Sequence, residues 1–214
     1  MSLVVNEIFY SIQGESIETG MPCVFVRLTG CNLRCAYCDT RYAYDEGSAT
    51  SIDEIVRQVL SYGVGLVEIT GGEPLIQEKT PALAAKLLKT GLEVMVETNG
   101  SMDIDLIDRR CIRVMDIKCP SSNEASENNL ENLDRLTEKD RLKFVISDRN
   151  DYCFAKIFIR NKLKTAPVCP VLFSPVSGGL DPAVLAEWIL ADRLNVRLQV
   201  QLHRILWPDK ERGV

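Results

Sequence analysis

The chain of 214 residues contains one histidine, His203, and no excess of basic residues, since 25 lysines and arginines stand against 30 aspartates and glutamates. No stripe of basic side chains with interleaved aromatics occurs, which argues against direct binding of nucleic acid. No apolar run approaches the roughly 20 residues of a membrane-spanning helix. The first ten residues lack the basic region and apolar core of a secretory signal. We therefore expect neither nucleic-acid nor membrane partners.

Apolar residues make up 46% of the sequence, enough to form a sizeable core. No low-complexity tract and no internal repeat divides the chain, so we expect a single domain over residues 1–214. Eight cysteines are present. Without a secretory signal, clustered thiols are more typical of metal ligands in a reducing cytoplasm than of disulfides, so we expect a cytoplasmic protein.

Three of the cysteines, Cys31, Cys35 and Cys38, stand in a CxxxCxxC spacing directly after the apolar run 24–28. Thiolate ligands favour iron–sulfur clusters, zinc or Cu(I). An ordinary four-iron cluster uses four cysteines, so three would leave one iron open to another molecule. Two alternatives stay open on spacing alone. The thiols could be buried small hydrophobes, or they could form part of a structural zinc site, although no second CxxC pair is present to complete one.

Strand-like and helix-like segments alternate after the cysteines. We expect helices over 52–62, 82–89, 104–109, 152–163 and 183–194, and strands over 66–70, 93–98, 111–117, 142–146, 168–173 and 196–201. Ser51 with Glu54 forms a capping box, and Thr80 and Asp181, each followed by proline, are predicted helix caps. Two β-prone runs before the cysteines, 4–9 and 23–28, predict a hairpin-like pair. The whole pattern favours an α/β fold with a predominantly parallel sheet.

Polar residues follow the ends of several predicted strands. Thr70, Asn99, Asp116 and Lys118 would share one rim of a parallel sheet. The run 71–74, GGEP, follows a strand, where two glycines let backbone N–H groups approach a ligand, although a plain tight turn is the commoner use. Residues 121–132 are rich in Ser, Asn and Glu, and form either a lid or a flexible surface loop.

The CxxxCxxC spacing with an aromatic residue before its last cysteine resembles the radical S-adenosylmethionine (SAM) superfamily. Further motifs resemble one family within it, the 7-carboxy-7-deazaguanine synthases: IFYSIQGE at 8–15, RLTGC at 27–31, CDT at 38–40, TGGEP at 70–74, ETNG at 97–100 and QLH at 201–203. The resemblance covers nearly the whole chain and implies a radical SAM partial (β/α) barrel. Some members carry extra residues between their first two cysteines, and this chain does not.

The resemblance also implies the ligands and their contacts. Cys31, Cys35 and Cys38 would hold a [4Fe–4S] cluster, with SAM on its open iron. The implied SAM contacts are Tyr37, Cys38, Asp39, Gly72, Asp116, Ile117 and Lys118. The implied substrate contacts are Ile12, Gln13, Gly14, Arg27 and Thr70, where the arginine fork suits a carboxylate. Thr40 matches a position that contacts Mg²⁺, an ion that keeps several non-protein ligands.

The implied reaction is that of a carbon–nitrogen lyase in 7-deazapurine (queuosine) biosynthesis, which converts 6-carboxy-5,6,7,8-tetrahydropterin to 7-carboxy-7-deazaguanine with loss of ammonia. A flavodoxin-like electron donor and a homodimer are implied as well. We assign no protein acid or base, because the cofactor carries the hard step, and we expect a structural role for His203. The rivals are another radical SAM enzyme, such as a glycyl-radical activase, and a zinc-bound module without catalysis.

Overall fold

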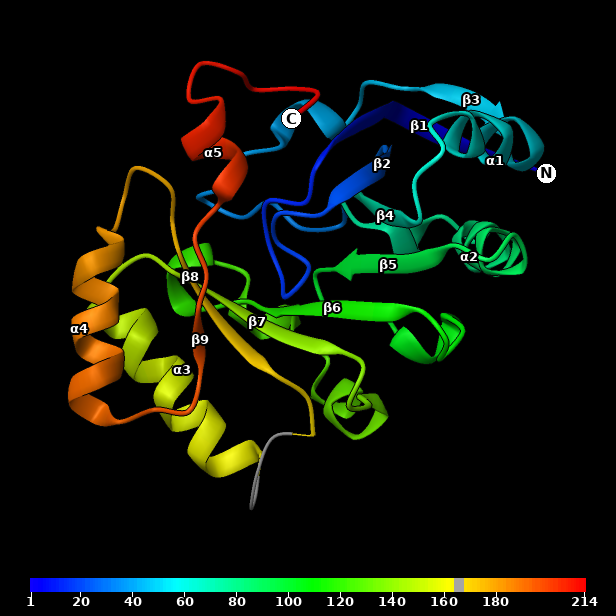
Figure 1. Ribbon diagram of the computed structural model, residues 1–214. Helices are drawn as coiled ribbons and strands as arrows, with labels where there is room; N and C mark the ends of the chain where they lie inside the picture. The colour runs from blue at the N-terminus through cyan, green and yellow to red at the C-terminus, as the bar shows by residue number, and fades with distance from the viewer. Residues whose placement is uncertain (164–167) are drawn as a thin grey trace.

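The computed structural model describes residues 1–163 and 168–214. Its described part is organised by a nine-stranded sheet with the strand order β3-β1-β2-β4-β5-β6-β7-β8-β9 (Figure 1). The β1 strand pairs antiparallel with both β2 and β3, and every pair from β2–β4 to β8–β9 is parallel. The predicted α/β class, the predominantly parallel sheet and the N-terminal hairpin are confirmed.

The strands are β1 (Ser2–Ile12), β2 (Pro22–Leu28), β3 (Ser48–Ser51), β4 (Leu66–Gly71), β5 (Glu93–Thr98), β6 (Ile112–Ile117), β7 (Arg141–Ile146), β8 (Val171–Pro175) and β9 (Arg197–Leu198). The helices are α1 (Ile52–Ser61), α2 (Thr80–Lys89), α3 (Arg149–Lys162), α4 (Pro182–Asp192) and α5 (Leu202–Leu206). No helix in the described residues combines the length and the apolarity that crossing a bilayer would require.

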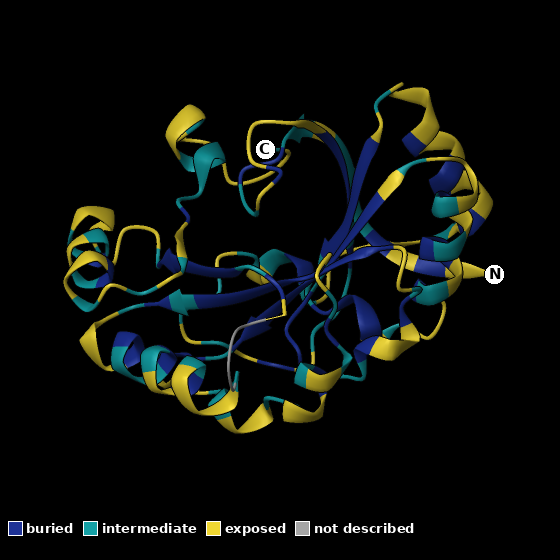
Figure 2. Cartoon of the chain, turned by 60° about the horizontal axis from the view of Figure 1, so that its bottom comes forward, coloured by how far each residue is buried: buried dark blue, intermediate teal, exposed yellow. Residues whose placement is uncertain are grey.

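Helices α1 to α4 cover the outer face of the sheet. Their apolar faces, which include Ile55, Leu83 and Leu185, form one buried cluster with alternate strand residues such as Val26 and Phe144. Figure 2 shows buried strands flanked by helices whose opposite sides are exposed. Successive side chains of a strand point to opposite faces, so each strand gives only every second residue to this core.

The inner face of the same strands is different. Near the amino ends of the parallel strands, this face carries a second, smaller apolar cluster, formed by Cys23, Phe25, Leu66, Met95, Ile112 and Val114. Phe9 stacks on Phe25 with ring centroids 4.9 Å apart. Above this cluster, toward the carboxyl ends of the parallel strands, the inward-facing residues become polar. The fold thus places a polar rim over an apolar floor on one side of the sheet.

Two of the three predicted helix caps are present. The Ser51 hydroxyl accepts a hydrogen bond from the Glu54 N–H (3.2 Å), and the Asp181 carboxylate accepts from the Ala183 N–H (2.8 Å). The cap prediction for Thr80 is wrong, because Lys79 holds the N-cap position. The Thr80 hydroxyl instead donates to the Pro74 carbonyl (2.6 Å), which ties α2 to the turn after β4.

Several predicted boundaries also differ from the structure. Residues 104–109 were expected to be helical, but only Ile104–Leu106 forms a single 3₁₀ turn, and of 196–201 only Arg197–Leu198 pairs as a strand. Residues 48–51 carry no strand pattern, yet they pair with the β1 edge. Pairing with a distant edge is a tertiary effect that local sequence does not encode.

Candidate active site

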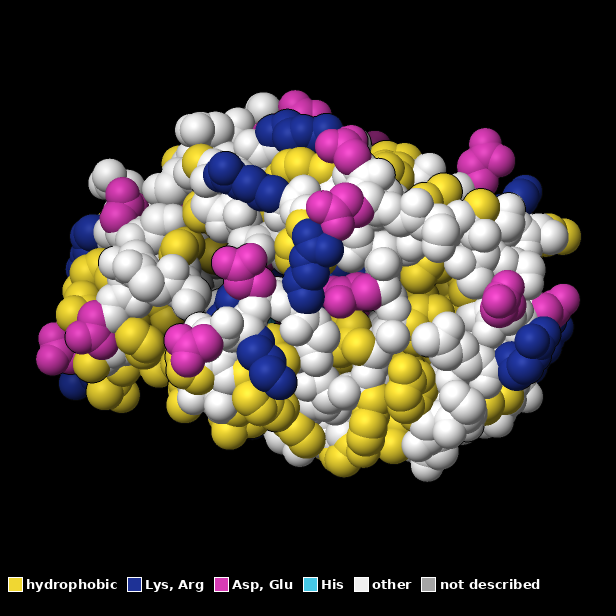
Figure 3. All heavy atoms as spheres, turned by 90° about the horizontal axis from the view of Figure 1, so that it is seen from above, with side chains coloured by type: hydrophobic (Ala, Val, Ile, Leu, Met, Phe, Trp, Pro, Cys, Tyr) yellow, Lys and Arg dark blue, Asp and Glu magenta, His cyan; other side chains and the backbone are white. Residues whose placement is uncertain are grey.

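A pocket lies on the inner face of the sheet, between the cysteine loop, the carboxyl ends of the parallel strands and the C-terminal segment. It brings together almost all of the predicted site residues: Ile12, Gln13, Gly14, Arg27, Cys31, Cys35, Tyr37, Cys38, Asp39, Thr40, Thr70, Gly72, Asp116 and Lys118. Figure 3 views the molecule over α5 and the C-terminal segment, where side chains of both charge signs are interspersed.

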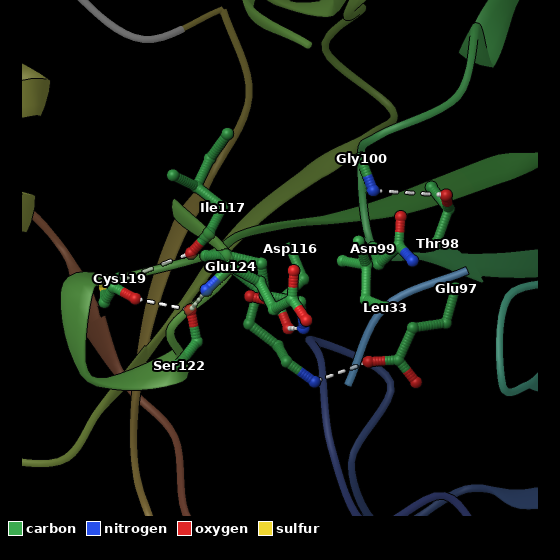
Figure 4. A network of polar contacts seen from close by, with 12 residues as sticks. Leu33, Glu97, Thr98, Asn99, Gly100, Asp116, Ile117, Cys119, Ser122 and Glu124 are labelled. Atoms are coloured by element: carbon green, nitrogen blue, oxygen red, sulfur yellow. Dashed lines mark hydrogen bonds and ion pairs between the residues drawn. The ribbon is translucent and has the colours of Figure 1, made fainter. Parts of the chain in front are cut away.

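Ile117 is the predicted contact that the pocket does not include. Its side chain is 1% exposed and belongs to the outer core. Figure 4 shows the Ile117 side chain pointing away from the side of the sheet on which Glu97 and Asp116 lie. This follows from strand alternation, because Asp116 and Lys118 face inward and the residue between them must face outward. Only the backbone of Ile117 remains available for a ligand.

The cysteine loop is held in place by the segment after β6. The Ala36 N–H donates to the Ser122 carbonyl (3.0 Å), and the Arg34 N–H donates to the Glu124 carboxylate (2.6 Å). Ser122 and Glu124 lie in a run of short 3₁₀ turns rather than in an extended loop (Figure 4). Residues 121–132, considered above as a lid or a flexible loop, therefore buttress the loop that carries the cysteines.

The three cysteines are free and partly buried, and all three face the pocket. Within 1–163 and 168–214, no three His, Cys, Asp or Glu side chains are arranged to hold a metal ion, so the sulfurs are gathered but not preset as a ligand set. Burial raises the pKa of the Cys31 and Cys35 thiols. Metal coordination deprotonates a thiol outright. Three sulfur donors on one loop fit an iron–sulfur cluster by their chemistry.

The turn after β4 brings backbone against backbone next to the cysteines. A Cβ atom on Gly72 would lie 2.1 Å from the Gly30 carbonyl oxygen and 2.8 Å from the Cys31 Cβ, so only glycine fits there. Glu73 is fully buried and accepts hydrogen bonds from the Asn99 N–H (2.6 Å) and the Thr98 hydroxyl (2.9 Å). Glu73 therefore locks the ends of β4 and β5 together while Gly72 lines the pocket.

Four buried polar atoms of pocket-lining residues lack a partner among the described residues: the Tyr37 hydroxyl, Asp116 Oδ1, Gln201 Oε1 and Arg204 Nε. The first two belong to predicted SAM contacts. The other Asp116 oxygen, Oδ2, pairs with the Lys118 ammonium at 2.7 Å. Burial alone would lower the pKa of Lys118, but the Asp116 carboxylate raises it above its ordinary value, so the lysine stays charged. Buried polar atoms are almost always hydrogen-bonded in native proteins. The unpaired atoms of Tyr37 and Asp116 mark where a ligand would complete the wall next to the cysteine loop.

Arg27 extends from β2 into the pocket between two aromatic rings, Phe9 (5.6 Å to the centroid) and Tyr42 (5.7 Å). Its Nε donates to the Glu7 carboxylate at 2.8 Å. Only this edge of the guanidinium is engaged within the described part of the chain, so the terminal nitrogens remain for a ligand. Thr40 lies at the mouth, where its hydroxyl donates to Asp39 (3.0 Å).

The sequence reading missed a charged network on the inner face. The Lys143 ammonium of β7 contacts the carboxylates of Glu15 (2.8 Å) and Glu97. Burial raises the pKa of Glu15, but Lys143 and the side-chain amide of Gln201 outweigh it and bring the pKa to about 2. A signal for this network was present, because Lys143 and Glu97 are charged residues inside otherwise apolar strand runs.

The tip of the β1–β2 hairpin crosses the pocket floor. Glu18 forms a buried ion pair with Arg141 of β7 (2.6 Å), and the Ser16 N–H donates to Gln199 (2.7 Å). His203 packs against the tip, where a Cβ on Gly14 would lie 2.2 Å from its Nδ1. Burial lowers the pKa of His203, which lines the pocket wall. Its structural role stays a prediction.

Comparison with known proteins points to one group. The radical SAM superfamily model matches residues 25–144. The 7-carboxy-7-deazaguanine synthase of Koribacter versatilis is 44% identical over 98% of this chain and 99% of its own length, and that of Chlorobaculum tepidum is 45% identical over 99% and 97%. The crystal structure of QueE from Escherichia coli superposes with a TM-score of 0.78 at 24% identity, covering 95% of both chains.

The family model spans the cysteine loop and strands β4 to β6, and the relatives align over the entire fold. Family membership implies a [4Fe–4S] cluster and SAM. The chain belongs to the radical SAM superfamily and, within it, to the 7-carboxy-7-deazaguanine synthases.

Proposed function

We propose that this chain converts 6-carboxy-5,6,7,8-tetrahydropterin to 7-carboxy-7-deazaguanine with loss of ammonia, in 7-deazapurine biosynthesis. The observation that carries the proposal is a single pocket in which the three-cysteine loop faces Arg27 and the charged rim of the sheet. Relatives bearing the name of this activity align with the chain from end to end. We further propose that residues 1–214 act as one domain, because the described strands form a single sheet and residues from Ile12 to Val214 line the same pocket.

Cys31, Cys35 and Cys38 are proposed to hold the cluster. When bound, the cluster and SAM supply the one-electron chemistry that starts the reaction. The chain's own part is to bind and orient. Tyr37 Oη and Asp116 Oδ1 are buried without a partner among the described residues, so a SAM molecule that offers them hydrogen bonds would satisfy two atoms that burial keeps out of water.

Apart from Ile117, the remaining proposed SAM contacts line the same pocket as Tyr37 and Asp116. The exposed backbone at Gly72 lies beside Cys31, and the charged Lys118 offers a donor next to Asp116. Asp39 stands at the mouth of the pocket, where it also contacts Gln201 at 3.3 Å. Ile117 is proposed to contribute through its backbone alone, since its side chain lies in the outer core.

Substrate is proposed to bind on the Arg27 side. A carboxylate can take the terminal nitrogens of Arg27 as a bidentate pair, and such charge-assisted bonds are among the strongest that side chains form. Thr70 is the neighbour of Arg27 on the next strand, in register with it. Ile12 and Gly14 border the same space. A pocket walled by these residues suits a small molecule better than the glycyl loop of a partner protein.

Three further parts of the proposal rest on the family resemblance. They are a Mg²⁺ ion, which Thr40 would help to hold next to the substrate carboxylate, a flavodoxin-like electron donor, and a homodimer. Thr40 lies at the pocket mouth beside the Asp39 carboxylate, and hydroxyl and carboxylate oxygens are ligands that Mg²⁺ accepts.

The test is anaerobic turnover. Protein reconstituted with iron and sulfide is incubated with the carboxylated tetrahydropterin, SAM, Mg²⁺ and a reductant, and the product is identified by mass and ultraviolet absorbance. The proposal predicts brown protein with about four iron atoms per chain, and formation of 7-carboxy-7-deazaguanine. Colourless protein that retains zinc and forms no product would favour the zinc-bound module instead.

A further inference from the structure

One carboxyl group of the inner face stands apart from the charged network, at the pocket floor. Glu68 lies two residues before Thr70 on β4, so it faces the same side one layer deeper. Its partners in register are Phe25 on β2 and Met95 on β5, both members of the apolar floor. The side chain is 5% exposed, and it lines the pocket. Burying a carboxyl in such surroundings is costly unless it is hydrogen-bonded and paired or becomes neutral.

The two oxygens of Glu68 are used unequally. Oε2 accepts a hydrogen bond of 2.5 Å from the side-chain amide of Gln13. Oε1 has no hydrogen-bond partner among the described residues, and it is not one of their fully enclosed unpaired atoms. One oxygen is therefore fixed by the protein while the other is left to face the cavity.

Gln13 itself is fully engaged. Its Nε2 donates to Glu68, its Oε1 accepts from the Glu15 N–H (3.1 Å), and its side chain is 2% exposed. Its backbone N–H and carbonyl pair with Met21 and Gly20 across the hairpin tip. The side chain of Gln13 has little left to offer a ligand directly. What it does is hold Glu68 in one orientation.

The surroundings of Glu68 favour its neutral form. Burial raises its pKa well above the ordinary range, and the nearby carboxylates of Glu97 and Glu15 raise it further. Gln13 and Lys143 act in the opposite direction, but the lysine is shared between those same two carboxylates. A neutral carboxyl whose Oε2 accepts from Gln13 can present an O–H donor at Oε1.

We propose that Glu68 is a specificity-determining residue that donates a hydrogen bond to the ring carbonyl of the substrate heterocycle, and that Gln13 is a positioning residue acting through it. The inference rests on the proposed function. A pterin held by its carboxylate at Arg27 has its pyrimidine ring, with the carbonyl, at the opposite end of the molecule. Arg27 lies level with Thr70, one layer above Glu68, so that end can reach the floor.

The test compares two fluorescent probes on the reconstituted enzyme in the presence of SAM. 6-Carboxypterin carries the ring carbonyl, and 2,4-diaminopteridine-6-carboxylate carries an amino donor in its place. Wild-type protein should prefer the first by about tenfold or more, since the mismatched probe either leaves the Glu68 O–H unpaired or requires the buried carboxyl to ionise near Glu97 and Glu15. Glu68→Met should shrink this preference to about threefold or less, because a thioether cannot donate.

Glu68→Gln is the conservative rescue. Its amide can donate to the ring carbonyl while its oxygen accepts from Gln13, so the wild-type preference should survive. The matched control is Glu93→Gln, an exposed carboxyl on the neighbouring strand. If Glu68→Met fails to fold, Gln13→Met gives the second test, and it should lower the preference because Glu68 is no longer held.

The outcomes separate the two proposals. Binding of both probes with an unchanged preference in Glu68→Met or Gln13→Met overturns the role of Glu68 and leaves the proposed function standing. Equal weakening of both probes in Glu68→Met, with the preference kept, overturns it in favour of a purely structural role. Failure of wild-type protein to bind either probe argues against the proposed function itself.

Discussion

The two faces of the sheet are built from alternate residues of the same strands, but one face packs the core and the other lines the pocket. On the outer face, residues such as Val26, Ile69 and Phe144 bury apolar area against helices. On the inner face, their neighbours Arg27, Thr70 and Lys143 line the pocket. Each strand thus serves stability on one side and ligand binding on the other, because the pleat alternates every residue.

Substitutions on the outer face and substitutions on the inner face should therefore have different effects. An outer-face truncation leaves a cavity in a tightly packed core, so it should cost stability and spare the chemistry of the protein that remains folded. A change on the inner face or the cysteine loop removes a polar or sulfur ligand that the core does not need. It should cost function and affect stability only where it breaks an ion pair, as in the charged network of Glu15 and Lys143.

The largest effect is expected at the cysteine loop. Cys35→Ala should abolish SAM cleavage, measured as 5′-deoxyadenosine released under anaerobic conditions, because one of only three cluster ligands is lost. The melting temperature should change little, since Cys35 lies on a loop and is partly exposed. The matched control is Cys153→Ala on α3, which should cleave SAM as wild type does. Full cleavage by Cys35→Ala would refute its assignment as a ligand.

The next effect lies on the outer face. Phe144→Ala should lower the free energy of unfolding by about 3–5 kcal/mol, because its ring packs edge-on against Phe158 and Phe173 in the buried cluster. Urea unfolding followed by circular dichroism measures this loss. The turnover of the fraction that remains folded should match wild type. A large loss of activity per folded molecule would contradict the claim that outer-face residues serve stability alone.

Arg27→Ala should produce a smaller, selective loss. Removing the fork should weaken substrate binding by about tenfold to a hundredfold, since hydrogen bonds to charged groups contribute roughly 1.5–3 kcal/mol. SAM affinity should stay close to that of wild type. Calorimetric titration of each ligand measures the two separately, with the exposed Arg57→Ala as control. Equal losses for SAM and substrate would contradict a carboxylate clamp.

The smallest effect concerns acid stability. The pKa of Glu15 is about 2 in the folded protein against an ordinary 4.5, because Lys143 outweighs the effect of burial. Its contribution to stability is present above pH 4.5 and is lost as the pH falls toward 2. Glu15→Gln should therefore flatten the fall in unfolding free energy over this window, whereas Glu127→Gln on the surface should not. Parallel curves for wild type and Glu15→Gln would contradict the charged network.

The sequence was most informative where a local pattern carries its own cause. The strand alternation and the Ser51 and Asp181 caps each arise from neighbouring residues, and the structure has them as expected. The Thr80 cap failed because its hydroxyl finds Pro74, whose position depends on how the turn after β4 folds. A local pattern cannot foresee that competition.

The charged network could not be predicted from the sequence for a related reason. Glu15 and Lys143 stand 128 positions apart in sequence, and only the crossing of the hairpin tip over the floor joins them. The strand runs did contain the hint, a lysine among apolar neighbours. Its partner could not be named without the topology. Likewise, the family resemblance implied a SAM contact at Ile117, between Asp116 and Lys118. The alternation of the strand turns the Ile117 side chain to the other face of the sheet.

The most direct measurement is a crystal structure of the reconstituted enzyme grown without oxygen in the presence of SAM and the pterin. We expect an iron–sulfur cluster held by three protein sulfurs, from Cys31, Cys35 and Cys38, with SAM on the fourth iron and the pterin between Arg27 and the sheet floor. A metal centre whose every ligand position is filled by a protein atom would contradict this expectation.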